Sequence, residues 1–426
     1  MHEDFRPTRH KPKRIEPLEA PERKPLPDLG EPTPDEPIFH TPEEVAEAEK
    51  TDTTTASEAQ LALPEHISRS WWQSLIKWKP TRKEAIIISA AVILLGGAVA
   101  VFAVEHKSPV KAPAIIKTIP KVTKPVVPTT VPSTLTGLPV DPAVNQRPVT
   151  GVMLENSPDA RPQSGLNQAG VVFEAIAEGG ITRFLALFQD TQPDYIGPVR
   201  SARPYYVQWD LGFDAGYAHV GGSPEAIADI KAWNVKDLDQ FYNSGSYQRI
   251  STRYAPHNVY SSAAQLTQLQ ISKGFTSSKY TGFTRKTDAP SKTPTASSID
   301  LTFSSYYYNV HYDYDATTNT YKRSEGGAAH MELNKDGSQV QIAPKVVLAL
   351  VMPYSIESDG DHSVYQTIGS GPLYVFQDGV VTQGTWAKSA STSQFTFTGS
   401  DNKPIALNAG QTWVSALAST SDVVYK

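Results

Sequence analysis

Two arginines, Arg200 and Arg203, lie three residues apart in the segment GPVRSARP, residues 197–204. A guanidinium group presents a planar fork of hydrogen-bond donors that matches phosphate or carboxylate, and the glycine and prolines favour a defined turn around the pair. The segment therefore predicts an anion clamp, in which Ser201 is a further candidate ligand residue. The alternative is that both arginines form structural ion pairs, and the sequence does not decide between these two interpretations. The candidate acidic partners are Glu174, Glu178 and Asp210.

A second polar segment, YAHVGGSPE, occupies residues 217–225. It is typical of a strand that ends in a glycine pair and leads into a helix capped by Ser223. Backbone N–H groups and the helix dipole at such a turn can hold an oxyanion, although many strand-to-helix turns bind nothing. His219 is a candidate general base, and the alternative for a single histidine on a strand is a hydrogen-bonded structural role.

A third polar segment, YQRISTRYAPHN, covers residues 247–258 and is typical of a loop, where ligand contacts are common. If the three segments converge, four guanidinium groups and two imidazoles would line one cleft, and the expected ligand would be anionic. The candidate residues added here are Arg249, Arg253, His257 and Asn258 from this segment, and Arg183 from a predicted strand.

The sequence lacks the motifs of several common catalytic classes. Neither Ser201 nor Ser223 stands in a G-x-S-x-G elbow or an S-x-x-K motif, and the glycine pairs fit neither the G-x-G-x-x-G fingerprint nor the P-loop. The chain has no cysteine, which excludes a disulfide framework and a thiol nucleophile. Its net charge of −5 at pH 7 gives no reason to expect nucleic acid as a partner. These residues predict no cofactor, and whether the protein is an enzyme stays open.

An uncharged, apolar run at residues 85–104 is about 20 residues long and predicts one membrane-spanning helix. The basic flank before this run places the N-terminus in the cytoplasm. We expect a disordered cytoplasmic tail over residues 1–70, a basic and aromatic juxtamembrane segment over residues 71–84, and a proline-rich stalk over residues 105–137. The expected localisation is the cell membrane, in a single pass, with the C-terminal domains outside the cytoplasm.

The region after the stalk predicts an α+β fold in two domains. A mixed α/β domain is expected over residues 138–280, a linker over residues 281–299 and a mainly β domain over residues 300–426. Aspartate and glycine at positions 378 and 379 predict a hairpin turn in the second domain. The expected strands are residues 149–154, 171–176, 183–189, 306–314, 346–352, 395–397 and 412–414, and the expected helices begin at Ser223 and Ser261.

Several stretches of the chain resemble the YerB-like lipoproteins, a family that carries a paired domain of unknown function. The resemblance implies a bacterial protein that faces the cell envelope, and it implies no activity. Members of that family attach through a lipidated cysteine, so in this chain the spanning helix would take that role. The N-terminal matches are RPV at 147–149, MLEN at 153–156, ARPQSGL at 160–166, EAIAEGGITR at 174–183, residues 197–204 and APHN at 255–258. The C-terminal matches are YKR at 321–323, GTWAK at 384–388 and LNAGQTW at 407–413.

A weaker similarity is to the LytR-CpsA-Psr family, in the order and spacing of GPVR at 197–200 and YAHVGG at 217–222. That family transfers lipid-linked glycopolymers to the cell wall. The similarity implies a phosphotransferase in which arginines clamp a pyrophosphate beside Mg²⁺. The stretch that corresponds to the family's acidic metal ligand reads NQAG, residues 167–170, and contains no carboxylate. The clamp would consist of Arg200, Arg203 and Arg249, and the candidate metal ligands are Glu174 and Glu178.

Three functions therefore stay open. The first is a non-catalytic envelope protein whose arginine-rich cleft binds an anionic wall polymer, a lipid head group or a partner protein. The second is a phosphotransferase that acts on a lipid-pyrophosphate-linked glycopolymer. The third is a structural scaffold, in which the arginines form internal ion pairs.

Overall fold

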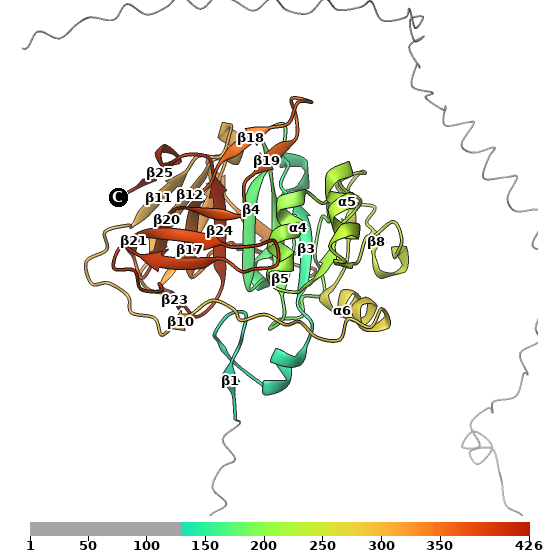
Figure 1. Ribbon diagram of the computed structural model, residues 1–426, viewed down its shortest axis with the longest axis horizontal. Helices are drawn as coiled ribbons and strands as arrows, with labels where there is room; N and C mark the ends of the chain where they lie inside the picture. Colours follow the sequence, from blue (N-terminus) through green and yellow to red (C-terminus); the bar gives the residue numbers. More distant parts are fainter. Residues whose placement is uncertain (1–128) are drawn as a thin grey trace, which may run out of the picture. The chain divides into compact units, whose positions relative to one another are not determined.

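One ten-stranded sheet runs through residues 129–426, the part of the chain that the computed structural model describes (Figure 1). Strands β24 and β4 lie side by side in parallel, with Thr412 opposite Val171, and so join the C-terminal half of the sheet to the N-terminal half. The strands in spatial order are β22 (Thr396–Gly399), β21 (Val380–Lys388), β20 (Gly369–Gln377), β17 (Val346–Val351), β24 (Thr412–Leu417), β4 (Val171–Glu178), β5 (Ile181–Phe188), β3 (Thr150–Glu155), β6 (Gly216–Ala218) and β7 (Lys236–Asp237).

The two expected ectodomains share this sheet, and part of the expected linker packs into the fold. Within the expected linker, β10 (Arg285–Lys286) pairs in parallel with β23 (Leu407–Asn408), and Phe283 is buried. The Arg285 guanidinium donates to the Leu135 carbonyl at 2.6 Å. The last residues of the expected stalk also belong to the fold, since β1 (Val131–Pro132) pairs with β2 (Pro139–Val140) and Leu135 is fully buried. Residues 129–426 therefore pack as one unit.

Three helices cover the two faces of the N-terminal half of the sheet. Helices α4 (Pro204–Leu211) and α5 (Pro224–Ala232) pack on one face through Tyr206 and Ile230, in a cluster that contains Phe173. Helix α6 (Ala263–Ser272) packs on the other face through Leu266. Serine side chains cap α5 and α6, because Ser223 Oγ accepts from the Ala226 N–H and Ser262 Oγ from the Gln265 N–H.

A second, five-stranded sheet packs against the C-terminal half of the first. Its inner residues, among them Ile299 and Tyr312, meet Val347 of β17 and Phe376 of β20 in one apolar cluster. Its strands in spatial order are β14 (Ala328–Ala329), β13 (Thr320–Glu325), β12 (Val310–Asp315), β11 (Ser298–Leu301) and β25 (Val423–Tyr425). The remaining pairs are β15 (Met331–Leu333) with β16 (Gln339–Gln341), β18 (Tyr354–Ile356) with β19 (Ser363–Tyr365), and β8 (Gln248–Arg249) with β9 (Val259–Tyr260). Short 3-10 turns occupy Pro142–Gln146, Pro158–Ala160, Leu166–Gln168, Ser244–Ser246, Tyr306–Tyr308 and Thr420–Asp422.

The strand-rich, mixed fold class is confirmed, and the hairpin at Asp378 is present, with φ of 58° there and 76° at Gly379. The expected strand over residues 306–314 is wrong in its first half, where Tyr306–Tyr308 forms a 3-10 turn before β12. No helix within residues 129–426 is long and apolar enough to cross a membrane. The expected spanning helix at 85–104, the segments at 1–70 and 71–84 and most of the stalk lie outside the described residues.

Candidate functional site

Two of the predicted arginines share one carboxylate where β4 turns into β5. Glu178, the last residue of β4, forms ion pairs with both Arg183 and Arg203. Arg183 also donates to the backbone carbonyl of Ser201 at 3.2 Å, and Arg203 donates to the Ala202 carbonyl at 2.7 Å. The arginine side chains are only 3% and 6% exposed, and burial lowers the pKa of each. Their donors point toward the protein. This is the arrangement expected if the arginines form structural ion pairs instead of an anion clamp.

Arg200 lies beside these two but in a more open setting. Its backbone N–H donates to the Met153 carbonyl, which brings its side chain to Glu155 at the end of β3. The Arg200 Nε lies 3.3 Å from Glu155 Oε1, and His257 Nδ1 lies 2.9 Å from the same oxygen. Ser157 Oγ donates to that oxygen as well, at 2.9 Å. Arg200 and His257 side chains are 23% and 22% exposed, whereas Glu155 is buried.

The two groups adjoin, because Glu155 is the ladder partner of Arg183 in the β3–β5 pair. We call them together the arginine cluster: Arg183, Arg200, Arg203, Glu155, Glu178, Ser157 and His257. Within residues 129–426, the two terminal nitrogens of Arg200 form no hydrogen bond with the protein, and its one ion pair uses Nε. Burial lowers the pKa of Arg200, and the charge of Glu155 opposes that shift. Arg200 is therefore the member of the cluster that can accept an additional anionic partner.

The other predicted residues do not complete a single cleft. His219 is fully buried, with Nδ1 2.8 Å from the Gly221 carbonyl and Nε2 3.1 Å from Asp237, which matches the structural alternative for this histidine. Arg253 donates to the carbonyls of Asp159 and Pro162, each at 2.8 Å, and ties the loop before β9 to the chain after β3. Arg249 Nη1 donates to Asn258 Oδ1 at 2.9 Å. Ser223 caps helix α5 by accepting from the Ala226 N–H.

Both carboxylates named as metal ligands already hold arginine side chains. Glu174 is fully buried and accepts from Arg323 Nη2 at 2.8 and 2.9 Å and from Trp413 Nε1 at 2.9 Å. Glu178 is held by two arginines, as described above. A divalent ion at either carboxylate would have to displace an arginine from it. These ion pairs count against Mg²⁺ ligands at the two positions.

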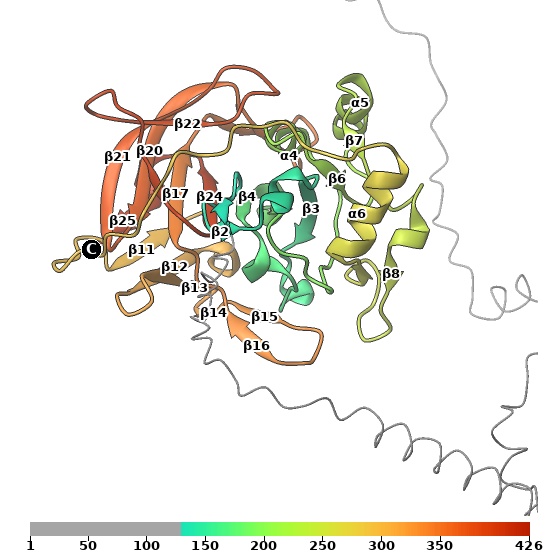
Figure 2. The same ribbon diagram turned by 90° about the horizontal axis from the view of Figure 1, so that it is seen from below.

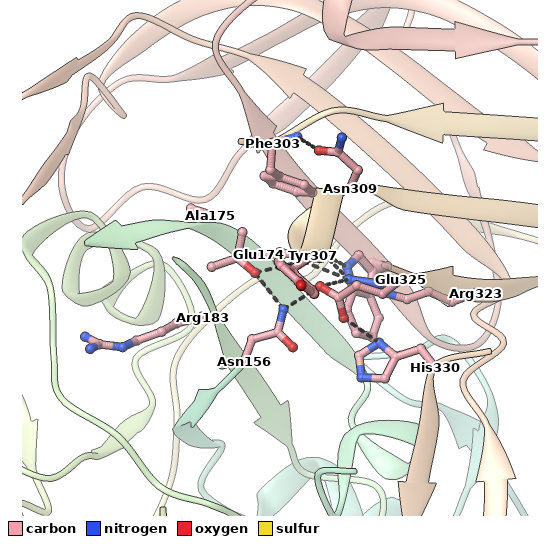
Figure 3. A network of polar contacts seen from close by, with 12 residues as sticks. Asn156, Glu174, Ala175, Arg183, Phe303, Tyr307, Asn309, Arg323, Glu325 and His330 are labelled. Atoms are coloured by element: carbon pink, nitrogen blue, oxygen red, sulfur yellow. Dashed lines mark hydrogen bonds and ion pairs between the residues drawn. The ribbon is translucent and has the colours of Figure 1, made fainter. Parts of the chain in front are cut away.

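A buried polar network joins the two halves of the chain, and sequence reasoning missed its C-terminal members. From the N-terminal half, Asn156 Nδ2 donates to Glu325 Oε1 at 2.6 Å (Figure 3). Glu325 Oε2 lies 3.2 Å from His330 Nδ1, while Arg183 points away from this group (Figure 3). We call it the buried network, and its members are Asn156, Arg161, Gln163, Glu174, Arg323, Glu325 and His330.

The pKa values in the buried network depend both on burial and on the charges of neighbouring members. Burial opposes the charge of Arg323, but Glu174 and Glu325 outweigh it and raise the pKa of Arg323. Burial raises the pKa of Glu325 to about 7, although Arg323 acts in the opposite direction. Burial, with the charges of Arg323 and Arg161, holds the pKa of His330 well below its ordinary value. The sequence signal for this network is the alternation in β13, which turns residues 321, 323 and 325 inward.

Comparison with known proteins agrees with the resemblance drawn from the sequence. The N-terminal domain model of a family described as "Protein of unknown function (DUF3048)" matches residues 135–276, and its C-terminal domain model matches residues 299–414. A Bacillus subtilis (strain 168) protein named "Putative lipoprotein YerB" is 30% identical over 285 residues, which are 66% of this chain and 84% of that protein. The crystal structure of Bacillus subtilis YerB has a TM-score of 0.62 at 28% identity, over 70% of this chain and 99% of that one. The chain belongs to the DUF3048 family, and YerB is a relative of this chain.

Proposed function

We propose that this protein is a membrane-anchored envelope protein that binds phosphate groups of an anionic wall polymer through Arg200 and His257, without catalysing a reaction. The observation that carries the proposal is the charge of the arginine cluster. Three arginines face two glutamates there, and Arg200, the most exposed of the three, uses only Nε in its ion pair with Glu155. A guanidinium group with free terminal donors can hold a phosphate in a two-pronged contact.

The envelope location is supported from two sides. The relative YerB carries the word lipoprotein in its name. Residues 85–104 supply an apolar run of the length that crosses a bilayer. With the N-terminus in the cytoplasm, the folded residues 129–426 would face the wall.

The proposal stops short of phosphoryl transfer. That reaction requires a metal or an equivalent charge to neutralise the transferred group, and Glu174 and Glu178 already hold arginines. Arg203, which the phosphotransferase hypothesis placed in the clamp, is committed to Glu178. The surface of the arginine cluster is thus better suited to holding an anion than to activating one.

The test is a titration of the full chain, in detergent micelles, with poly(glycerol phosphate), and with phosphatidylglycerol vesicles as a second source of phosphate. Wild type should bind the polymer, with an affinity that falls as salt rises. Arg200→Ala should weaken that affinity about tenfold or more. The matched control is Arg147→Ala. Arg147 precedes the first residue of β3, whereas Glu155, which pairs with Arg200, is the last residue of that strand.

Polymer binding that Arg200→Ala weakens and Arg147→Ala leaves unchanged would support the proposal. Binding to vesicles alone would indicate that the ligand is a lipid head group. Equal affinity for both variants, or no binding to either source, would contradict it.

A further inference from the structure

A pocket of about 350 Å³ opens beside the buried network, at the junction of the two halves of the chain. Its walls come from the segment after β3, the 3-10 turn before β12, the end of β13 and the β15–β16 hairpin, which lies next to β14 (Figure 2). The volume is at the small end of the range of about 300–1,000 Å³ that is usual for small-molecule sites. Its polar lining residues are Arg161, Glu325, His330 and Gln339.

Arg161 brings an unused donor to this pocket. Its Nε donates to Asn156 Oδ1 at 3.1 Å, and its Nη2 donates to the carbonyls of Asn156 and Tyr307, each at 2.9 Å. The same Nη2 lies 3.2 Å from Glu325 Oε1. Within residues 129–426, Nη1 forms no hydrogen bond with the protein, and the side chain is 19% exposed.

Glu325 and His330 line the pocket as a pair. The Glu325 side chain is 1% exposed, and its Oε2 lies 3.2 Å from His330 Nδ1. Because His330 Nε2 lies 2.9 Å from Gln163 Oε1, both imidazole nitrogens have neighbours in the protein. The polar groups that a ligand can reach are therefore Arg161 Nη1 and the amide of Gln339, which is exposed.

The charges around the pocket are of mixed sign. Arg161 and Arg323 face Glu174 and Glu325, so a charged ligand would meet groups of both signs there. Beside the polar groups, Tyr307 is 60% exposed and stands edge-on to Tyr306, which is 64% exposed, with ring centroids 5.9 Å apart. An exposed aromatic ring next to paired donors and acceptors suits a ligand with one apolar face and a rim of hydroxyl groups.

We propose that this pocket binds one sugar unit of an uncharged saccharide, at a second site independent of Arg200. The ligand's hydroxyl groups pair with Arg161 Nη1 and the Gln339 amide, and its apolar face lies against Tyr307. The phosphate-binding proposal and this one rest on different residues, so either can fail alone.

The experiment is isothermal titration of the full chain, in detergent micelles, with chitotetraose and with maltotetraose. We expect at least one saccharide to bind, and Tyr307→Ala and Gln339→Ala to weaken it, the former about tenfold. The matched control is Tyr254→Ala, since Tyr254 is 91% exposed and does not line the pocket. Arg200→Ala should leave saccharide affinity unchanged.

Two results would overturn the proposal. One is the absence of binding heat with both saccharides up to their solubility limits. The other is equal affinity in Tyr307→Ala and Tyr254→Ala, which would place any sugar contact elsewhere on the surface. Because Tyr307 and Gln339 lie at the rim rather than in the core, these variants are expected to fold, and their thermal unfolding is measured alongside.

Discussion

Arg323 and Arg200 carry the same guanidinium group in opposite surroundings. Arg323 is completely buried, holds both oxygens of Glu174 and lies over the Trp413 ring, with its guanidinium carbon 4.7 Å from the ring centroid. Arg200 is 23% exposed and meets Glu155 through Nε alone. The difference teaches that the partners of an arginine, and not the number of arginines in a segment, separate a structural residue from one that can bind a ligand.

Arg323→Ala should produce the largest loss of stability that this comparison predicts. It would leave Glu174 buried without its ion partner, at a cost of about 3–5 kcal/mol in the free energy of unfolding. Urea unfolding of the variant measures this cost. The matched control is Lys322→Ala on the same strand, where the side chain is 50% exposed and pairs with Asp315, and the expected loss is within about 1 kcal/mol. Equal losses in the two variants would refute the structural role of Arg323.

His330→Gln should change how stability depends on pH. The pKa of His330 is lowered in the folded protein, so below its ordinary value of 6.5 only the unfolded chain takes up this proton. Wild type should then lose about 1.4 kcal/mol per pH unit from this group as the pH falls from 6.5 towards 5, and His330→Gln should not. Glu325 acts in the opposite direction, because its pKa is raised, but it is present in both proteins. Parallel pH profiles for the two proteins would contradict this prediction.

Cleavage in residues 281–299 should leave the two halves of the chain associated. Lys292 is exposed and offers trypsin a site, whereas β10 is paired with β23. The cut protein should still run as one species in size-exclusion chromatography, because β24 and β4 pair across the two halves. Separation of the fragments without denaturant would show that the shared sheet does not hold them together.

Arg249→Ala should have the smallest effect. Arg249 lies on an exposed hairpin and donates to one amide, Asn258 Oδ1. We expect the free energy of unfolding to change by about 0.5 kcal/mol or less, and the affinity for poly(glycerol phosphate) to fall less than in Arg200→Ala. A larger loss of affinity than in Arg200→Ala would indicate that the polymer binds at the hairpin and not at Arg200.

Local sequence patterns predicted the central strands but not all of their surroundings. Strands β3, β4, β17 and β24 are buried almost throughout and are mainly apolar, as is usual for strands covered on both faces. Helix α4 was missed because its sequence, PYYVQWDL, is rich in aromatic residues and no side chain caps it, so tertiary packing of its buried tyrosines and tryptophan decides its conformation.

The arginine cluster was predicted only in part, because the contacts within it also depend on tertiary structure. The arginine pair at residues 200 and 203 was found from its spacing, but its partners depend on sheet register. Glu155 faces Arg183 across the β3–β5 ladder, and Arg323 meets Glu174 from 149 residues away in the chain. No local pattern carries that information. The polar composition of residues 281–299 predicts a linker, whereas backbone pairing of β10 packs part of this segment into the fold.

The measurement that tests the account most directly is the affinity of Arg200→Ala for poly(glycerol phosphate), together with its free energy of unfolding. The account predicts a loss of affinity of about tenfold or more with a change in stability within about 1 kcal/mol, because Glu155 keeps His257 and Ser157 as partners. Unchanged affinity with a loss of stability like that expected for Arg323→Ala would contradict it, and would make Arg200 one more structural arginine.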